Sequence, residues 1–335
     1  MGERQGNYTE KLITPERAAE LMEEGGWKRA DLHVHTNCSF DVLPAGNLHP
    51  EKLYEKALGE GLDFITFTDH DTVEAYEILG WEREKLVTGI EMMVHDPEWA
   101  GHTLHVNVFD LDREEFEELR EIAEIEHSLK SFVHYLKKNR LPFIYNHPFW
   151  FEFHQEPNPS VVPGLAKLFP VLEYNMHEPK LKNELTISIA ETLGKGIVAT
   201  TDSHTGKFGQ VYTLAKGESF REYFRNIEKG RNYIVTEDLT REFLIEEMNT
   251  WIDLIFEKSR KSQEIKTFLT GIKSLDTMVR LSRSALLNCF PGLNRTTMNL
   301  LYMISNTGLP ASFYLHSEEN LAREIEKQIE NETWK

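Results

Sequence analysis

Residues 31–41 read DLHVHTNCSFD and place two histidines within one short apolar segment. Because side chains at positions i and i+2 of a β-strand lie on the same face, His33 and His35 point toward one spot, which suits a metal ion. Asp41 follows just beyond the segment. Histidines also occur in strands without binding metal, so this pair alone favours a metal site and an ordinary strand about equally. The rest of the chain must distinguish the two.

The composition indicates a large folded protein with an acidic surface. The chain has 335 residues, of which 40% are hydrophobic and 11% aromatic, enough for one large domain and a smaller one. The formal net charge of −18 argues against an extended nucleic-acid binder. It stays compatible with a small phosphorylated substrate, because bound cations can reverse the charge of a local site.

Cysteine usage and hydropathy predict a cytoplasmic protein. Cys38 and Cys289 are the only cysteines, and they are not arranged as C-x-x-C, which fits a reducing compartment. The first twenty residues have no apolar core of a secretion signal, and no apolar run approaches the length of a membrane span. We therefore expect no membrane partner, and the sequence leaves the oligomeric state open.

Seven β-rich segments alternate with helical stretches, as in a parallel sheet built from βα units. One helical stretch has Pro50 near its start, and another has Gly194 as its C-terminal stop. Two insertions rich in Pro, Gly and aromatic residues, 95–102 and 149–164, are expected at the rim of a pocket. The seven β-rich segments are 29–35, 62–70, 86–94, 103–111, 141–148, 171–176 and 196–204.

These patterns predict an α/β protein with three parts. Residues 1–26 form an N-terminal extension, residues 27–238 hold the βα units, and residues 239–335 form a helical C-terminal domain. Between Lys258 and Arg295 there are eight Lys or Arg residues and only two acidic ones, Glu264 and Asp276. This local positive charge is unusual in an acidic chain, so these helices are candidates for binding a partner.

Metal-binding side chains recur near the ends of the β-rich segments. In a βα barrel the carboxyl ends of all parallel strands face one rim, so residues far apart in sequence meet there. The set exceeds what one tetrahedral ion needs, which implies two or three ions. Asp69 precedes His70 in a strand and is expected to point away from the site. The candidate metal ligands are His33, His35, Asp41, His70, Glu91, His105, His147, Asp202 and His204.

The motifs DLHVHTNCSFD, LDFITFTDHDT, GIEMM, LHVNVF, YNHP and TDSHTG follow one another between about residues 30 and 215. In this order they resemble the polymerase and histidinol phosphatase (PHP) family of metal-dependent phosphoesterases. The resemblance implies a distorted (β/α)7 TIM-like barrel with a trinuclear centre of divalent Zn, Mn or Fe ions. By position, one ion is held by His33, His35, Glu91 and Asp202, a second by Glu91, His105 and His147, and a third by Asp41, His70 and His204. We prefer His105 to the nearby His102 because His105 lies inside a β-rich run.

The predicted activity is hydrolysis of a small phosphorylated metabolite or nucleotide by a hydroxide that the metal ions activate. Glu91 and Asp202 are candidate catalytic residues, with His177 as a candidate general acid. Lys207 and His154 are candidate substrate-binding residues, and the aromatic insert 149–164 either stacks on a ring or only covers the barrel mouth.

Two alternatives remain open from the sequence. The first is a nucleic-acid-processing phosphodiesterase or nuclease that binds DNA or RNA through the basic C-terminal helices. The second, which we favour less, is a metal-bound module that binds without turnover.

Overall fold

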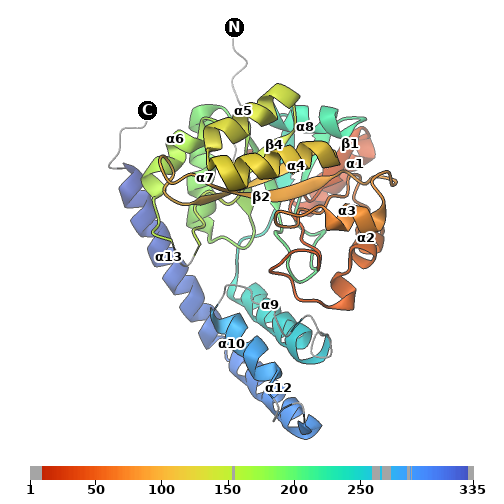
Figure 1. Cartoon of the computed structure of the whole chain (residues 1–335), viewed down its shortest axis with the longest axis vertical. Coiled ribbons are helices and arrows are strands. Elements are labelled where there is room, and N and C mark those ends of the chain that lie inside the picture. The colour runs from red at the N-terminus through yellow and green to blue at the C-terminus, as the bar shows by residue number, and fades with distance from the viewer. Residues whose placement is uncertain are drawn as a thin grey trace.

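The computed structural model describes residues 10–152, 155–258, 265, 273–284, 287 and 289–330. At its centre is a five-stranded sheet in the order β2-β3-β4-β5-β6 (Figure 1). Strand β3 is antiparallel to β2 and β4, whereas β4, β5 and β6 run parallel to one another. The strands are β2 (Gly89–His95), β3 (Thr103–Phe109), β4 (Phe143–Tyr145), β5 (Val171–Asn175) and β6 (Gly196–Thr200).

A second sheet has three antiparallel strands in the order β1-β7-β8. They are β1 (Trp27–Ala30), β7 (Tyr212–Lys216) and β8 (Asn232–Val235), and the last two lie outside the segments expected to be strands. Beside them are α1 (Pro15–Glu24) and α8 (Phe220–Glu228). The mixed α/β class is therefore confirmed, but the described residues do not form a closed sheet of seven parallel strands.

Two of the expected strands are extended segments with isolated bridges instead. Single parallel bridges join Val34 to Ser203, Ile65 to Leu86 and His70 to Glu91. The physical reason is that side chains replace the backbone ladder there. The backbone N–H of Val34 donates to Thr68 Oγ1 at 3.2 Å, and that of Thr36 donates to Asp69 Oδ1 at 2.6 Å. A regular strand would have paired these groups with backbone carbonyls.

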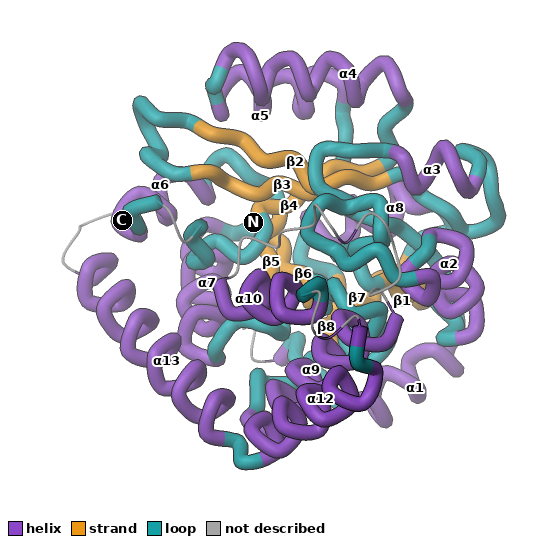
Figure 2. The backbone as a smooth tube through the Cα atoms, turned by 60° about the horizontal axis from the view of Figure 1, so that its bottom comes forward, coloured by secondary structure: helices purple, strands orange, loops and turns teal. Residues whose placement is uncertain are grey.

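The helices around the larger sheet follow local signals in the sequence. As predicted, α2 (Pro50–Gly59) begins at its proline, and α7 (Lys180–Leu193) ends at Gly194 with φ of 63°. The charged run after Asp112 divides into α4 (Arg113–Glu121) and α5 (Leu129–Asn139), because His127 is left-handed and Ser128 caps the second helix. These two helices cover the outer side of β2 and β3 (Figure 2). The shorter helices are α3 (Glu74–Leu79) and α6 (Val162–Ala166).

The C-terminal part is helical, as expected. It contains α9 (Arg241–Asp253), α10 (Lys273–Ser282), α12 (Pro291–Asn306) and α13 (Leu309–Glu330). Figure 2, which brings the bottom of Figure 1 forward, shows α9, α10 and α12 in front of the sheet. The long helix α13 contacts α7 and α9. Sixteen of the 38 residues of the basic stretch 258–295, among them Arg260, Lys261 and Lys266, lie outside the described residues.

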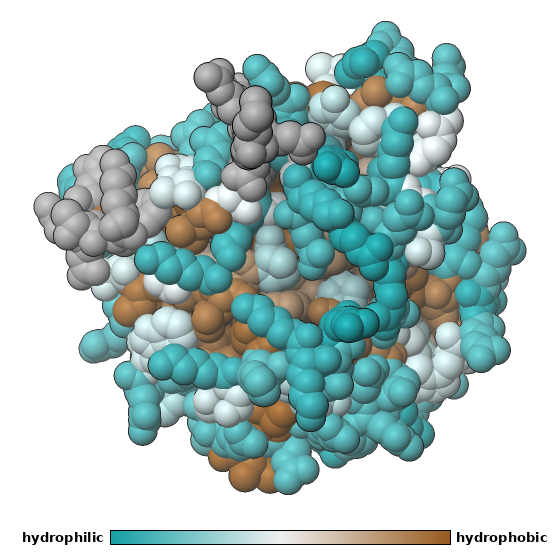
Figure 3. Space-filling view, turned by 90° about the horizontal axis from the view of Figure 1, so that it is seen from above, coloured by the Kyte–Doolittle hydropathy of each residue, from teal (hydrophilic) through white to brown (hydrophobic). Residues whose placement is uncertain are grey.

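The face seen from above in Figure 1 is mostly hydrophilic, with hydrophobic residues gathered in a band across its middle (Figure 3). Within the described part of the chain, no helix is both long enough and apolar enough to cross a membrane.

Candidate metal centre

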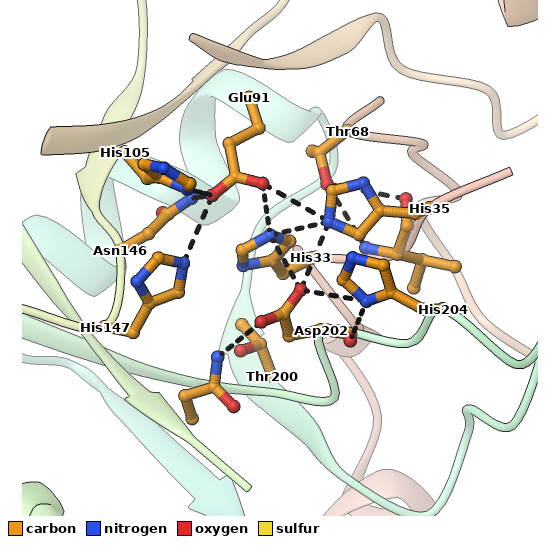
Figure 4. Close-up of polar contacts among 12 residues, drawn as sticks. His33, His35, Thr68, Glu91, His105, Asn146, His147, Thr200, Asp202 and His204 are labelled. Atoms are coloured by element: carbon orange, nitrogen blue, oxygen red, sulfur yellow. Dashed lines mark hydrogen bonds and ion pairs between the residues drawn. The ribbon is translucent and has the colours of Figure 1, made fainter. Parts of the chain in front are cut away.

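The predicted ligands meet in one buried cluster on one side of the larger sheet (Figure 4). Most of them come from the polar ends of strands or bridged segments, as expected. His105 arrives differently, because it is the third residue of β3, an antiparallel strand. The antiparallel pairing places the start of β3 beside the end of β2 and near the end of β4. His105 therefore reaches the same edge from the amino-terminal half of its strand.

Four donor atoms at the centre of this cluster are arranged for one small cation. His33 Nε2 lies 3.1 Å from His35 Nε2, 3.0 Å from Glu91 Oε2 and 3.2 Å from Asp202 Oδ1. His35 Nε2 lies 3.2 Å from Glu91 Oε2 and 3.1 Å from Asp202 Oδ1. Ligand bonds of about 2.0–2.1 Å in a tetrahedron give edges of about 3.3 Å, close to these separations. These donors therefore fit an ion such as zinc.

Glu91 connects this group to the neighbouring imidazoles through its two oxygens. Its Oε1 atom lies 3.1 Å from His105 Nδ1 and 3.3 Å from His147 Nε2, and it accepts a hydrogen bond from Asn146 at 2.8 Å. Its Oε2 atom lies 3.4 Å from His70 Nδ1, a buried nitrogen with no hydrogen-bond partner. A nitrogen lone pair facing a carboxylate oxygen needs a proton or a metal ion between them.

A further group lies at the more exposed side of the cluster. His204 Nε2 is 2.7 Å from Asp41 Oδ2, and His70 Nε2 is 3.3 Å from the same oxygen. Together with His35, these residues bring four donor atoms within 4.8 Å of one another. Two of the three predicted ligand sets thus have donor atoms within 4.8 Å of one another, the third set with His35 added. The second set is divided, because His105 groups with His70 and Glu91, whereas His147 groups with His33 and Glu173.

Glu173 belongs to the cluster although the sequence analysis did not single it out. It is fully buried in β5 and accepts hydrogen bonds from His33 Nδ1, the Thr200 hydroxyl and the backbone N–H of His147, each at 2.6 Å. Donation from Nδ1 leaves the lone pair of His33 Nε2 directed at the cluster. A lone glutamate inside the apolar segment VLEYNM was the signal that could have identified it.

Two of the predicted ligands occupy unusual backbone conformations. His147 has φ of 22° and Asp202 has φ of 50°, values that non-glycine residues adopt at a cost of about 1–3 kcal/mol. The hydrogen bond to Glu173 holds the His147 turn, and the buried carboxylate of Asp31 accepts from Thr201 just before Asp202. Such conformations concentrate at functional sites, where the surrounding contacts maintain them.

Electrostatics couples the imidazoles to the carboxylates. Burial lowers the pKa of His105, but the charges of Glu91 and Glu152 and their hydrogen bonds with the ring together outweigh burial and raise the pKa to about 10. Burial likewise opposes the charge of Asp41 at His204, whose pKa also rises to about 10. Burial raises the pKa of Glu91, yet the neighbouring imidazoles, His33 foremost, hold that pKa well below its usual range. The cluster therefore retains protons, and a site of this kind exchanges protons for metal ions.

The structure describes two of the three remaining candidates, His177 and Lys207. His177 is half-buried and places Nδ1 2.6 Å from the carbonyl oxygen of Thr201, and burial lowers its pKa. The Lys207 ammonium pairs with Glu247 of α9 at 3.2 Å. His102 is buried beside the carbonyl of Ala100 and takes part in none of the ligand groups, which supports the preference for His105. His154 lies outside the described residues.

Asp69 is also accounted for. It accepts from the backbone and hydroxyl of Thr36, as expected for a residue that points away from the site.

Comparison with known families agrees with this geometry. A profile described as the PHP domain matches residues 31–242, more than half of the chain. The chain belongs to the PHP family. The matched residues of this PHP domain include all nine predicted ligands, and membership supports a metal-dependent hydrolase of phosphate esters.

Individual relatives of the PHP chain are more distant. A 5′-3′ exoribonuclease of Haemophilus influenzae is 30% identical over 90 residues, which are 26% of this chain and 30% of the relative. The match thus spans less than a third of the relative's length.

Solved structures similar to this PHP chain share little sequence with it. PsfC from Pseudomonas syringae has a TM-score of 0.47 at 14% identity, covering 78% of this chain and 99% of its own. A protein assigned as a metal-dependent phosphoesterase from Bifidobacterium adolescentis has a TM-score of 0.40 at 16% identity, covering 59% and 94%. An amidohydrolase from Chromobacterium violaceum has a TM-score of 0.36 at 13% identity, covering 52% and 87%.

Proposed function

We propose that this protein hydrolyses the ester bond of a small phosphorylated metabolite or nucleotide. The observation that carries the proposal is the set of His33, His35, Glu91 and Asp202 within a PHP domain, where five of the six separations between donor atoms are 3.0–3.2 Å. Two or three divalent Zn, Mn or Fe ions are held by this set, by Glu91 with His105 and His147, and by Asp41 with His70 and His204.

Such ions, when bound, lower the pKa of water and neutralise charge on the phosphoryl oxygens. In the reaction a water oxygen bonds to phosphorus, the bond from phosphorus to the ester oxygen breaks, and that oxygen leaves as an alcohol after gaining a proton. The products are the alcohol and inorganic phosphate. Glu91 and Asp202 act by fixing the positions of the groups around the phosphate.

We assign to His177 the transfer of a proton in this reaction. The carbonyl oxygen of Thr201 can only accept, so Nδ1 of His177 carries the proton in that 2.6 Å contact. In the neutral ring Nε2 is then an acceptor, and it takes up the proton that water loses. The same nitrogen can donate it to the leaving oxygen. His177 thus acts first as a general base toward water and then, as predicted from the sequence, as a general acid toward the leaving oxygen.

The substrate phosphate is expected to meet Lys207 and His154 at the rim. Lys207 forms an ion pair with Glu247, so binding of the phosphate must compete with Glu247 for this ammonium group.

The proposal extends to the fold, since the bridged segments 31–35 and 64–70 support a distorted (β/α)7 barrel. The division near residue 238 and a cytoplasmic location also stay predictions.

The test is turnover of p-nitrophenyl phosphate and its bis ester by protein loaded separately with Mn, Zn or Fe. We expect release of nitrophenol by at least one loaded form and none after chelation. Elemental analysis of the same samples gives the number of bound ions. A protein with two or three ions per chain that hydrolyses neither ester, nor any other phosphate ester tried, would be a binding module instead.

A nucleic-acid substrate is the second candidate. It is favoured by the 90-residue match to an exoribonuclease and by the basic stretch 258–295. Binding through several phosphates should weaken steeply with salt, whereas hydrolysis of a small monoester should not. A labelled oligonucleotide that is neither shifted in a gel nor shortened would exclude this candidate.

A further inference from the structure

Two large aromatic side chains contact the metal cluster and are also exposed to solvent. Phe40 is 56% exposed and Trp150 is 41% exposed. Phe40 lies in the loop after His35, with its ring centroid 5.1 Å from that of His70. Trp150 follows His147, and its ring centroid is 5.1 Å from that of His105 and 5.4 Å from that of His147. Each ring therefore touches proposed ligands and also faces solvent.

The neighbouring residues show that this exposure is not imposed by the loop. Phe149, directly before Trp150, is 1% exposed and packs into the core. Val42, two residues after Phe40, is also buried. The loops thus bury one apolar side chain and leave another uncovered. Leaving a large ring in water forgoes the free energy of its burial, so such rings at a site commonly mark binding surfaces.

The two rings are linked through imidazoles of the cluster. Successive centroid separations of 5.1 Å lead from Phe40 to His70, from His70 to His105 and from His105 to Trp150. Asp202 and His204 have side chains that are 17% and 24% exposed, in contrast to 0% for His33. The cluster is therefore partly accessible from outside while its inner ligands are closed off, and both exposed rings adjoin its imidazoles.

We propose that Phe40 and Trp150 bind a planar ring of the substrate, and that the phosphate ester hydrolysed here is a nucleoside phosphate. This inference rests on the proposed phosphoesterase activity and names its substrate class. Aromatic side chains stack on the faces of nucleobases regardless of base identity. The phosphate is held at the cluster, and the base lies against Trp150 or Phe40. A phosphate ester without a planar ring lacks this interaction.

The first experiment compares adenosine 5′-monophosphate with ribose 5-phosphate, which has the same sugar and phosphate but no base. The metal-loaded protein should show a kcat/KM about 5- to 150-fold higher for the nucleotide, since stacking contributes about 1–3 kcal/mol per base. Equal values would overturn the inference and leave the phosphoesterase proposal intact.

Substitutions test whether the rings of Phe40 and Trp150 cause the preference for the nucleotide over ribose 5-phosphate. Trp150→Ala and Phe40→Ala should each reduce the ratio of the two kcat/KM values, and Trp150→Phe should keep most of it. The matched control is Phe313→Ala, because Phe313 is 77% exposed on α13 and should leave the ratio unchanged. Unchanged ratios in both alanine variants, with metal content preserved, would contradict the assignment.

A binding measurement separates failure of this inference from failure of the proposed function. The chain has six tryptophans, and stacking on Trp150 should quench part of their fluorescence. Adenosine 5′-monophosphate should quench and ribose 5-phosphate should not, and Trp150→Phe should lose the difference. Quenching without turnover of either compound would refute hydrolysis and keep the ring site. Turnover without quenching, at equal rates for both compounds, would refute the ring site alone.

Discussion

The metal cluster and the C-terminal helices differ in how densely their side chains are packed and in how much of them is exposed to solvent. In the cluster, Glu91 alone contacts five imidazoles and an amide, and His33 is completely buried. In the helices, Met303, Leu309 and Phe313 are 64%, 73% and 77% exposed. The difference implies that one change in the cluster disturbs many contacts, whereas a change in the helices acts through a few defined junctions.

The largest effect is expected from Glu91→Gln. The amide removes the negative charge that faces His33 and His35 on one oxygen and His105 and His147 on the other. Metal binding should therefore be lost, and kcat/KM should fall by at least about 100-fold. Elemental analysis and the p-nitrophenyl phosphate assay measure the two effects. Glu82→Gln, at an exposed position, is the control and should retain both. Full metal content and activity in Glu91→Gln would mean that the cluster is not the metal centre.

Glu173→Gln should weaken metal binding by about 10- to 100-fold, because a neutral amide oxygen polarises the Nδ1–H of His33 less than a carboxylate does and the amide nitrogen opposes the backbone N–H of His147. Competition with a chromophoric zinc chelator measures this affinity. The protein should stay folded, since an amide oxygen can still accept from Thr200. An affinity equal to that of the wild type would show that Glu173 does not orient His33.

Lys182→Met should loosen α13 without emptying the cluster. Lys182 is 3% exposed and pairs with Glu178 at 3.2 Å and with Glu318 of α13 at 2.9 Å. Removing it leaves Glu178 buried without its cation, at a cost of about 3 kcal/mol. Hydrogen exchange should become faster in α13, while metal content stays unchanged. Arg323→Met on the exposed face of α13 is the control, and loss of metal in Lys182→Met would show that the two regions are coupled.

The smallest effect is expected at the junction of α9 with the site. Phe243 of α9 packs against His177 with ring centroids 5.3 Å apart, and burial lowers the pKa of this histidine below 6.5. Phe243→Ala admits water, so the pKa should rise toward 6.5. If neutral His177 is required, the acidic limb of the pH–rate profile moves to higher pH by less than about one unit. Asn249→Ala, elsewhere on α9, should leave the limb in place.

An unmoved limb in Phe243→Ala would show that His177 does not set the pH dependence. It would also show that α9 does not influence the reaction through this contact.

The sequence predicted which side chains cluster better than it predicted the sheet. The clustering could be predicted because repeated histidine and carboxylate residues next to strand ends are typical of a shared site at one rim of the fold. The regions 31–35 and 64–70 could not be recognised as bridged segments, because the side chains of Thr68 and Asp69 that replace the ladder look like ordinary strand residues. The antiparallel direction of β3 was also hidden, since a strand pattern carries no direction.

Glu173 and Glu247 show a second limit. Each acts through residues more than twenty positions away, Glu173 through His33 and Glu247 through Thr205 and Lys207. Their roles depend on tertiary contacts that no local pattern reports.

The two oxygens of Glu91 face different histidines, and this has a consequence for how the protein takes up metal. An ion bound at Oε2 would hold the carboxylate with Oε1 directed at His105, where a second ion would bind. We therefore expect filling to be cooperative. In a cell short of metal, most molecules would then hold either the full set of ions or none, and few would hold only part of the set.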